Sequence, residues 1–178
     1  ENVITSLDFE RLLCATGPHE GEILRPSDKK HPRKIAWIQC VGSRQVISGG
    51  NSYCSAVCCT YTQKQVILTK DHNPEAECTI FHNDIRSYSK DFERFYHRAA
   101  NLPGVRFIRS YVSIGKEIAS SKNITIRYAT AEAGVNEEEF DLVVLSIGLN
   151  PPAEVEKLAD LYGIELNSHG FCKTNPTN

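Results

Sequence analysis

The chain has 178 residues, of which 40% are hydrophobic and 24% are charged, and its formal net charge is −2. These values are typical of an ordinary soluble domain and argue against a disordered, fibrous or coiled-coil protein. Acidic and basic residues are interspersed, so no basic face is available for nucleic acid or an anionic membrane. A membrane-spanning helix needs about eighteen consecutive apolar residues, and no apolar run in this sequence approaches that length. The first residues lack the charged and then apolar pattern of a secretory signal peptide. We therefore expect a cytoplasmic protein without a nucleic-acid partner or a membrane span.

The first 33 residues are expected to lead into the main domain. Residues 2–14 show helical spacing of apolar side chains and then break at Gly17 and Pro18, which predicts a short leading helix. Residues 21–33 are charged and contain Gly and Pro, as a connector would. The sequence contains no Met and stops in loop-like residues. We expect it to be a segment of a larger protein.

The next part of the chain alternates between strand and helix patterns. Residues 34–40 form a short apolar run without polar alternation, which is typical of a strand buried on both faces of a parallel sheet. Residues 53–70 contain no helix breaker and predict a helix, and residues 78–82 have strand composition. A second helix is predicted from Ser89, as N-cap, to Ala100. Strands separated by helical crossovers predict a parallel sheet.

The remaining elements predict a second, smaller sheet. Residues 105–112, 124–130 and 140–148 have strand patterns, and we interpret them as a small antiparallel meander whose last strand ends at Gly148. The acidic run at 136–141 is expected to be a solvated turn. The predicted fold class is α/β, a Rossmann-like domain of the dinucleotide-binding type with a parallel sheet, crossover helices and an antiparallel β-meander.

Four of the seven cysteines lie close together in the sequence: Cys40, Cys54, Cys58 and Cys59. Cys40 ends the first predicted strand, at the sheet edge where ligands bind in open α/β folds. If residues 53–70 are helical, Cys54 and Cys58 share one face of that helix. Four thiols match a [4Fe-4S] cluster, in which each iron takes one thiolate, better than a zinc knuckle of C-x2-C pairs. Cysteines also pack as small hydrophobic residues, and spacing alone does not separate ligation from packing.

The loop after the first strand can also be tested as a nucleotide site. A dinucleotide fold should show G-x-G-x-x-G there, whereas the sequence reads CVGSRQVISGG with Gly42 alone in the turn. An anionic cluster could take the place of the phosphates at the helix N-terminus. Asp84 and Arg86, where related folds contact the ribose, are therefore interpreted as loop capping or surface pairing.

Several segments resemble the heterodisulfide reductase A family and its relatives. They are KIAWIQCVGSR, YCSAVCC, CTIFHNDIR, FERFYHRAANLPGVRFIRS and EEFDLVVLSIGLNPP, and the resemblance covers nearly the whole chain. In that family a thioredoxin-reductase-like flavoprotein core carries FAD, and this chain resembles its second dinucleotide-binding domain. The resemblance implies that Cys40, Cys54, Cys58 and Cys59 ligate a [4Fe-4S] cluster near the flavin. It also implies electron transfer with other heterodisulfide reductase subunits and electron donors.

The resemblance further implies a division of the chain into three parts. Residues 1–33 would lead from the flavin domain, 34–150 would form the cluster-bearing domain, and 151–178 would return towards the flavin domain. The FAD-binding glycine motif of the family is absent, so FAD would be bound mostly outside this chain. We expect the isolated segment to be inactive although the larger protein is an oxidoreductase. The oligomeric state stays open.

Two other functions remain as alternatives at this stage. The domain could be a degenerate dinucleotide-binding scaffold that docks subunits, with packed or zinc-bound thiols. It could also be an NAD(P)-binding reductase domain, against which the missing glycine motif argues. Cys14, Cys78 and Cys172 are expected to be buried or simply exposed rather than ligating.

Overall fold

The computed structural model describes residues 1–46 and 49–175, and the contacts divide the chain into two compact units, Glu1–Gly148 and Leu149–Asn178. The division into 1–33, 34–150 and 151–178 stays a prediction, because compactness does not test where a domain of a larger protein begins. In the described part of the chain, no helix is long and apolar enough to cross a membrane.

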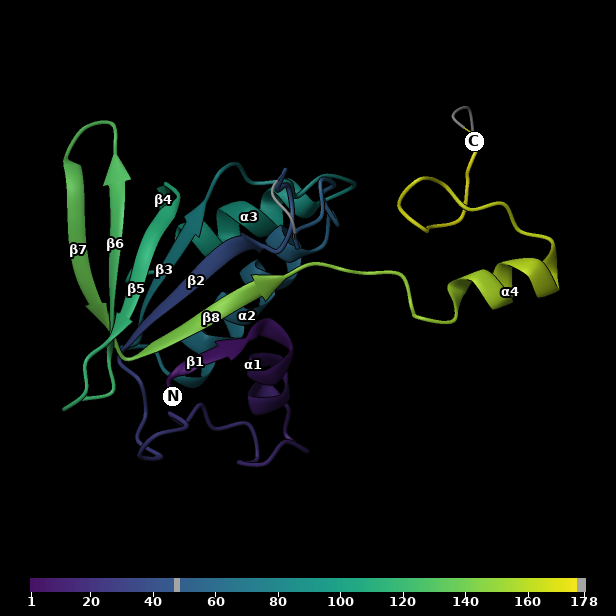
Figure 1. Cartoon of the computed structure of the whole chain (residues 1–178). Helices are drawn as coiled ribbons and strands as arrows, with labels where there is room; N and C mark the ends of the chain where they lie inside the picture. Colours follow the sequence, from purple (N-terminus) through teal and green to yellow (C-terminus); the bar gives the residue numbers. More distant parts are fainter. Residues whose placement is uncertain (47–48, 176–178) are drawn as a thin grey trace. The chain divides into compact units, whose positions relative to one another are not determined.

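The first unit is built on a parallel sheet of five strands in the order β1, β8, β2, β3, β4 (Figure 1). The strands are β1 (Val3–Thr5), β2 (Lys34–Val41), β3 (Glu77–His82), β4 (Val105–Arg109) and β8 (Leu142–Ile147). Helices α1 (Ser6–Leu13), α2 (Cys58–His72) and α3 (Phe92–Ala100) lie on one face. The expected alternation of strands and helices, and with it the α/β fold class, is confirmed.

A separate antiparallel sheet lies on the other face of the parallel sheet (Figure 1). It consists of β5 (Val112–Glu117), β6 (Ile124–Thr130) and β7 (Gly134–Phe140). The expected meander exists, but its predicted strands were partly wrong. Residues 105–109 and 142–147 pair in the parallel sheet, and the acidic run expected to be a turn is most of β7. A contact between the two sheets supplies stabilisation that the sequence of β7 does not show, since Arg106 of β4 donates to the Glu138 carboxylate at 2.7 Å.

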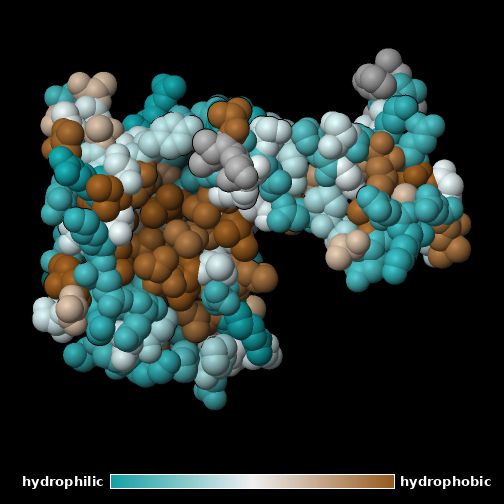
Figure 2. Space-filling view, viewed as in Figure 1, coloured by the Kyte–Doolittle hydropathy of each residue, from teal (hydrophilic) through white to brown (hydrophobic). Residues whose placement is uncertain are grey.

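Two hydrophobic cores sit on the two faces of the parallel sheet because successive side chains of a strand point to opposite faces. On the helix face, Ile35, Trp37 and Ile80 pack with Phe9 of α1 and Val66 of α2. On the meander face, strand residues that include Ala36, Phe81 and Val143 pack with Ile126 and Phe140. Figure 2 shows that part of the apolar surface of this unit stays uncovered beside the meander.

Two helix boundaries differ from the predictions. The leading helix begins at Ser6, because Val3–Thr5 pair with β8 instead, and Thr5 forms a capping box with Asp8. Helix α3 begins at Phe92 with Asp91 as N-cap, so Ser89 is not the cap that we expected. Asp91 and Ser89 both have positive φ, a left-handed backbone that the sequence pattern does not reveal.

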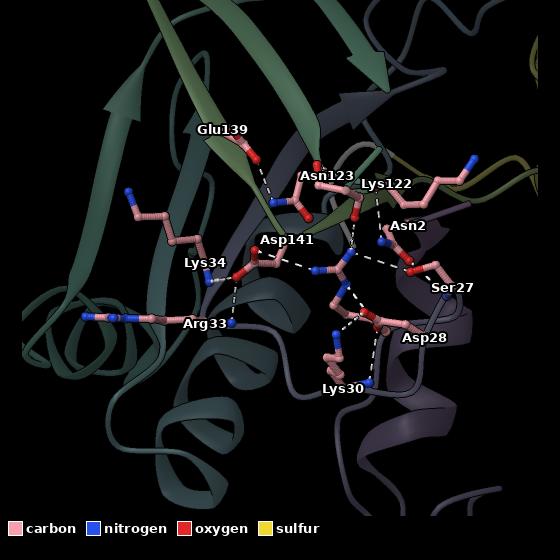
Figure 3. Close-up of polar contacts among 12 residues, drawn as sticks. Asn2, Ser27, Asp28, Lys30, Arg33, Lys34, Lys122, Asn123, Glu139 and Asp141 are labelled. Carbon is pink, nitrogen blue, oxygen red and sulfur yellow. Dashed lines mark hydrogen bonds and ion pairs between the residues drawn. The ribbon is translucent and has the colours of Figure 1, made fainter. Parts of the chain in front are cut away.

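The segment before β2 is held to the first unit by polar contacts at the amino ends of the strands (Figure 3). Arg25 donates to the Ser121 carbonyl at 2.7 Å and lies 3.8 Å from the Asp141 carboxylate. Asp141 also accepts the backbone N–H groups of Arg33 and Lys34 at 2.8 and 2.7 Å. We call Arg25, Asp28, Asn123 and Asp141 the amino-edge network.

The second unit contains helix α4 (Val155–Tyr162), which ends at Gly163 in the left-handed conformation. A single bridge joins Leu166 to Cys172. Helix and loop enclose an apolar pocket of about 380 Å³, lined by residues such as Val155, Ala159 and Phe171.

Candidate functional site

Cys40 lies at the carboxyl end of β2, where a β-bulge interrupts the pairing with β8. The register shifts between Ile38 and Val41, and Cys40 itself has a φ of 62°, in the left-handed region. A bulge redirects a side chain out of the regular alternation of its strand. Left-handed backbone at a residue other than glycine costs free energy and is found preferentially at functional sites. The expected position of Cys40 near the carboxyl end of the first long strand is confirmed.

The other three cysteines lie where helix α2 begins, but not all on the helix. The helix begins at Cys58 rather than at residue 53, and Cys54 lies in the preceding loop. The prediction that Cys54 and Cys58 share a helical face was therefore wrong. Ala56, with a φ of 58°, lets the loop fold back, so that its N–H lies 3.4 Å from the Cys54 sulfur.

The loop and the first helical turn bring all four thiols into one neighbourhood. Every pair among Cys40, Cys54, Cys58 and Cys59 is close enough for the charge of one thiolate to oppose ionisation of the other. The sulfur of Cys58 lies 3.4 Å from the Ile147 carbonyl, and that of Cys59 lies 3.9 Å from the Asp84 carbonyl. Residues from two strand ends, one loop and one helix thus meet at the carboxyl edge of the sheet.

Burial is the main influence on the ionisation of these thiols. It raises the pKa of Cys59 to about 11, and the neighbouring thiols add to the rise. Burial also raises the pKa of Cys40, although the charge and a hydrogen bond of Arg44 act in the opposite direction. The pKa of Cys58 is also raised by burial, while the nearby Tyr61 hydroxyl acts in the opposite direction. Without a bound cation these three thiols are therefore neutral at pH 7, and ligation must displace their protons.

The donor set of this site is all sulfur. Within residues 1–46 and 49–175, no group of three or more His, Cys, Asp or Glu side chains is already arranged to hold a metal ion. A zinc site needs four ligands around one centre, whereas a [4Fe-4S] cube spreads its four thiolates over four irons. The nearby hydroxyl of Ser43 and amide of Gln39 are buried without partners among the described residues. Four thiols from separate elements are compatible in number and type with a [4Fe-4S] cluster.

Comparison with known proteins gives close relatives. The chain is 44% identical over 97% of its length to the iron-sulfur A subunit of the CoB–CoM heterodisulfide reductase of Methanocaldococcus jannaschii. It is 42% identical over 97% of its length to the A subunit of the H2/formate:CoB–CoM heterodisulfide, ferredoxin reductase of Methanococcus maripaludis. The chain is homologous to a segment of the heterodisulfide reductase A subunit. It spans 26% of the length of each of these two relatives.

Two further comparisons were made, one with protein-family profiles and one with solved structures. No protein-family profile matches the chain. The crystal structure of L-lysine 6-monooxygenase from Pseudomonas syringae has a TM-score of 0.52 at 10% identity, covering 95% of this chain and 45% of that one. At this identity the likeness concerns the fold alone.

Asp84 and Arg86, which lie where related folds contact a nucleotide ribose, take part in ion pairs. Arg44 lies 2.5 Å from the Asp84 carboxylate, and Arg86 lies 3.5 Å from it. Although burial opposes ionisation, the hydrogen bond and charge of Arg44 hold the pKa of Asp84 below its usual value. Asp84 is engaged by two arginines, in line with its interpretation as a paired surface residue.

Four residues that the sequence did not single out for these roles shape the site. A Cβ added to Gly148 would lie 2.4 Å from the Ser55 hydroxyl and 2.5 Å from that of Ser43, so a larger residue would require these side chains to move. Tyr61 donates to the Ile147 carbonyl at 2.6 Å. Adjacency to a cysteine motif was the only available signal for Ser43 and Ser55.

The remaining cysteines, Cys14, Cys78 and Cys172, lie outside the neighbourhood of these four thiols. Cys78 is fully buried in the helix-face core, where burial raises its pKa to about 12. Cys14 is half-buried and Cys172 is exposed.

Proposed function

We propose that this chain is the cluster-bearing segment of a heterodisulfide reductase A-like FAD and iron-sulfur oxidoreductase, located in the cytoplasm. In this proposal Cys40, Cys54, Cys58 and Cys59 bind a [4Fe-4S] cluster that relays electrons to or from flavin. The names of the relatives, which include an iron-sulfur A subunit of a heterodisulfide reductase, support it. FAD, the other reductase subunits and the electron donors belong to the proposal for the whole protein.

The observation that carries the proposal is the meeting of four thiols from separate elements at the carboxyl edge of the sheet. Packing alone does not explain why one of them sits on a left-handed bulge residue and another in a loop. Ionisation of neighbouring buried thiols is unfavourable on its own, and a cationic iron core would offset the repulsion among the four thiolates that ligation creates.

The residues of the chain would have distinct tasks around the cluster. When bound, a [4Fe-4S] cluster supplies one-electron transfer at a potential set by its surroundings. The four thiols lose their protons on ligation, and Arg44 favours the ionised form of Cys40. Half-burial of Cys40 and Cys54 and full burial of Cys58 and Cys59 limit the access of water.

Iron and sulfide analysis of the anaerobically purified full-length protein tests the proposal. We expect the variants Cys54→Ser and Cys58→Ser to contain about four irons fewer per chain than the wild type, because one cluster is lost. Cys14→Ser and Cys172→Ser are matched controls that should keep the full iron content. Unchanged iron in both ligand variants, or zinc in place of iron, contradicts the proposal.

A further inference from the structure

Two polar side chains beside Cys40 are buried without hydrogen-bond partners. Gln39 is 8% exposed, and neither its amide nitrogen nor its amide oxygen has a partner among the described residues. Ser43 is 4% exposed, and its hydroxyl lacks a partner in the same part of the chain. Unpaired buried polar groups destabilise a fold, so such a pair indicates that the structure has room for a group that accepts their hydrogen bonds.

Both side chains lie around the first proposed ligand. Gln39 and Ser43 line the same cavity of about 200 Å³ as Cys40. The backbone N–H of Ser43 donates to the Cys40 carbonyl at 3.1 Å, which holds the turn after the strand. The Ser43 hydroxyl also approaches Gly148 from the same side as Ser55, the residue after Cys54. Ser43 is thus enclosed by the segments that carry the cysteines.

Gln39 directly precedes Cys40 in the irregular part of β2. The register with β8 shifts between Ile38 and Val41, so both residues belong to the bulge at the carboxyl end of the strand. Helix α2, which begins with Cys58 and Cys59, packs against β2. Gln39 and Cys40 therefore lie together in the bulge of a strand that α2 contacts.

We infer that the Gln39 amide N–H and the Ser43 hydroxyl donate hydrogen bonds to sulfur atoms of the cluster bound by the four cysteines. This inference rests on the proposed function. Hydrogen bonds to sulfur stabilise the reduced cluster, which carries one more negative charge, and so raise the reduction potential. Gln39 and Ser43 are positioning and tuning residues rather than ligands.

The variants Gln39→Leu and Ser43→Ala test this inference in the full-length protein. Each removes one donor and leaves all four thiols in place, so the iron content should equal that of the wild type. The potential of the cluster, followed by redox titration with electron paramagnetic resonance, should shift to more negative values in each variant and further in the double variant. The signal that belongs to this site is the one that disappears in Cys54→Ser.

A second measurement separates a hydrogen bond from a change in packing. After exchange into D2O, electron-nuclear double resonance should detect deuterium near the cluster in the wild type and a weaker coupling in each variant. Ser120→Ala, which removes an exposed hydroxyl, should leave both potential and coupling unchanged. If Gln39→Leu loses iron, the inference is tested with Ser43→Ala alone, because that substitution removes only one oxygen atom and changes the packing least.

The outcomes distinguish this inference from the function on which it rests. Iron retained with an unchanged potential and unchanged deuterium coupling in both variants overturns the donor role and leaves the cluster intact. If Cys54→Ser keeps all its iron and every signal, the proposed function itself fails.

Discussion

The amino and carboxyl edges of the parallel sheet differ in how many of their buried polar groups are hydrogen-bonded. At the amino edge, Asp141 accepts two backbone N–H groups and Arg25 donates to a carbonyl, so most polar groups of this network are paired (Figure 3). Among the described residues, two buried atoms of this network have no hydrogen bond, Arg25 Nε and Asn123 Oδ1. Arg25 Nε still lies 3.4 Å from the Asp28 carboxylate, and the Asn123 amide nitrogen donates to Glu139 at 2.6 Å. At the carboxyl edge, Gln39 and Ser43 hold buried atoms without partners among the described residues.

The difference in hydrogen bonding suggests different roles for the two edges. The amino edge stabilises the fold, and the carboxyl edge is available to bind a ligand. Paired polar groups at the amino edge join the segment before β2 to the meander and to β8. Unpaired groups at the carboxyl edge reduce stability, and they are retained where a bound group can satisfy them. In parallel α/β sheets the carboxyl edge is also where ligands bind.

The comparison is tested most strongly by removing one aspartate from each edge. Asp141→Ala leaves the N–H groups of Arg33 and Lys34 without their acceptor and removes one of the two carboxylates beside Arg25, so the free energy of unfolding should fall by about 3 kcal/mol. Asp84→Ala breaks only a partly exposed ion pair with Arg44, so the loss should be about 1 kcal/mol or less. Urea unfolding of the metal-free chain measures both. Equal losses would show that the two edges contribute alike.

Elements with a strong periodic pattern were predictable from the sequence. The apolar run 34–40 and the helical pattern after Ser89 led to β2 and α3 because buried faces repeat with a fixed period. Strand β7 was missed, since its acidic side chains are stabilised by partners such as Arg106, far along the chain. Strand β1 has three residues and pairs with β8 near the other end of the first unit, so no local pattern marks it.

The candidate site was predictable in composition but not in geometry. The spacing of Cys54, Cys58 and Cys59 drew attention to the right segment. The start of α2 at Cys58 depends on a left-handed loop residue, Ala56, which has no sequence signature. The bulge at Cys40 likewise follows from how β2 meets β8 and could not be read from β2 alone.

Two buried glutamines allow a hydrogen-bonded side chain to be compared with one that has no partner among the described residues. Gln65 accepts from Trp37 Nε1 at 3.1 Å and donates to the Ser6 carbonyl at 2.9 Å, so Gln65→Leu should destabilise the metal-free chain by about 2 kcal/mol. Gln39→Leu removes an amide without partners and should be neutral or stabilising by about 1 kcal/mol. Thermal unfolding without iron compares the two. A large loss for Gln39→Leu would mean that its amide has a partner in solution.

Glycines at two positions test how tightly the carboxyl edge is packed. Gly148→Ala places a methyl group against the hydroxyls of Ser55 and Ser43 and should cost about 1 to 2 kcal/mol, with less iron bound in the full-length protein. Gly115→Ala in β5 is the control, because its nearest atom is 3.8 Å away and the change should be close to neutral. The measurements are urea unfolding and iron analysis. A neutral Gly148→Ala would show that the edge is looser than its contacts indicate.

The smallest effect concerns the titration of Asp28 in the amino-edge network. Burial alone would raise its pKa, but the N–H of Lys30 and the charge of Arg25 outweigh it and hold the pKa below the usual 3.8. Because the folded state binds this proton more weakly than the unfolded chain, the contribution to stability is present above pH 3.8 and is lost as the pH falls through the lowered pKa. Carboxyl-carbon resonances in a pH titration should show this low midpoint, and Arg25→Ala should move it towards 3.8. A midpoint at or above 3.8 in the wild type would mean that the network does not form in solution, and the contrast between the two edges would then be lost.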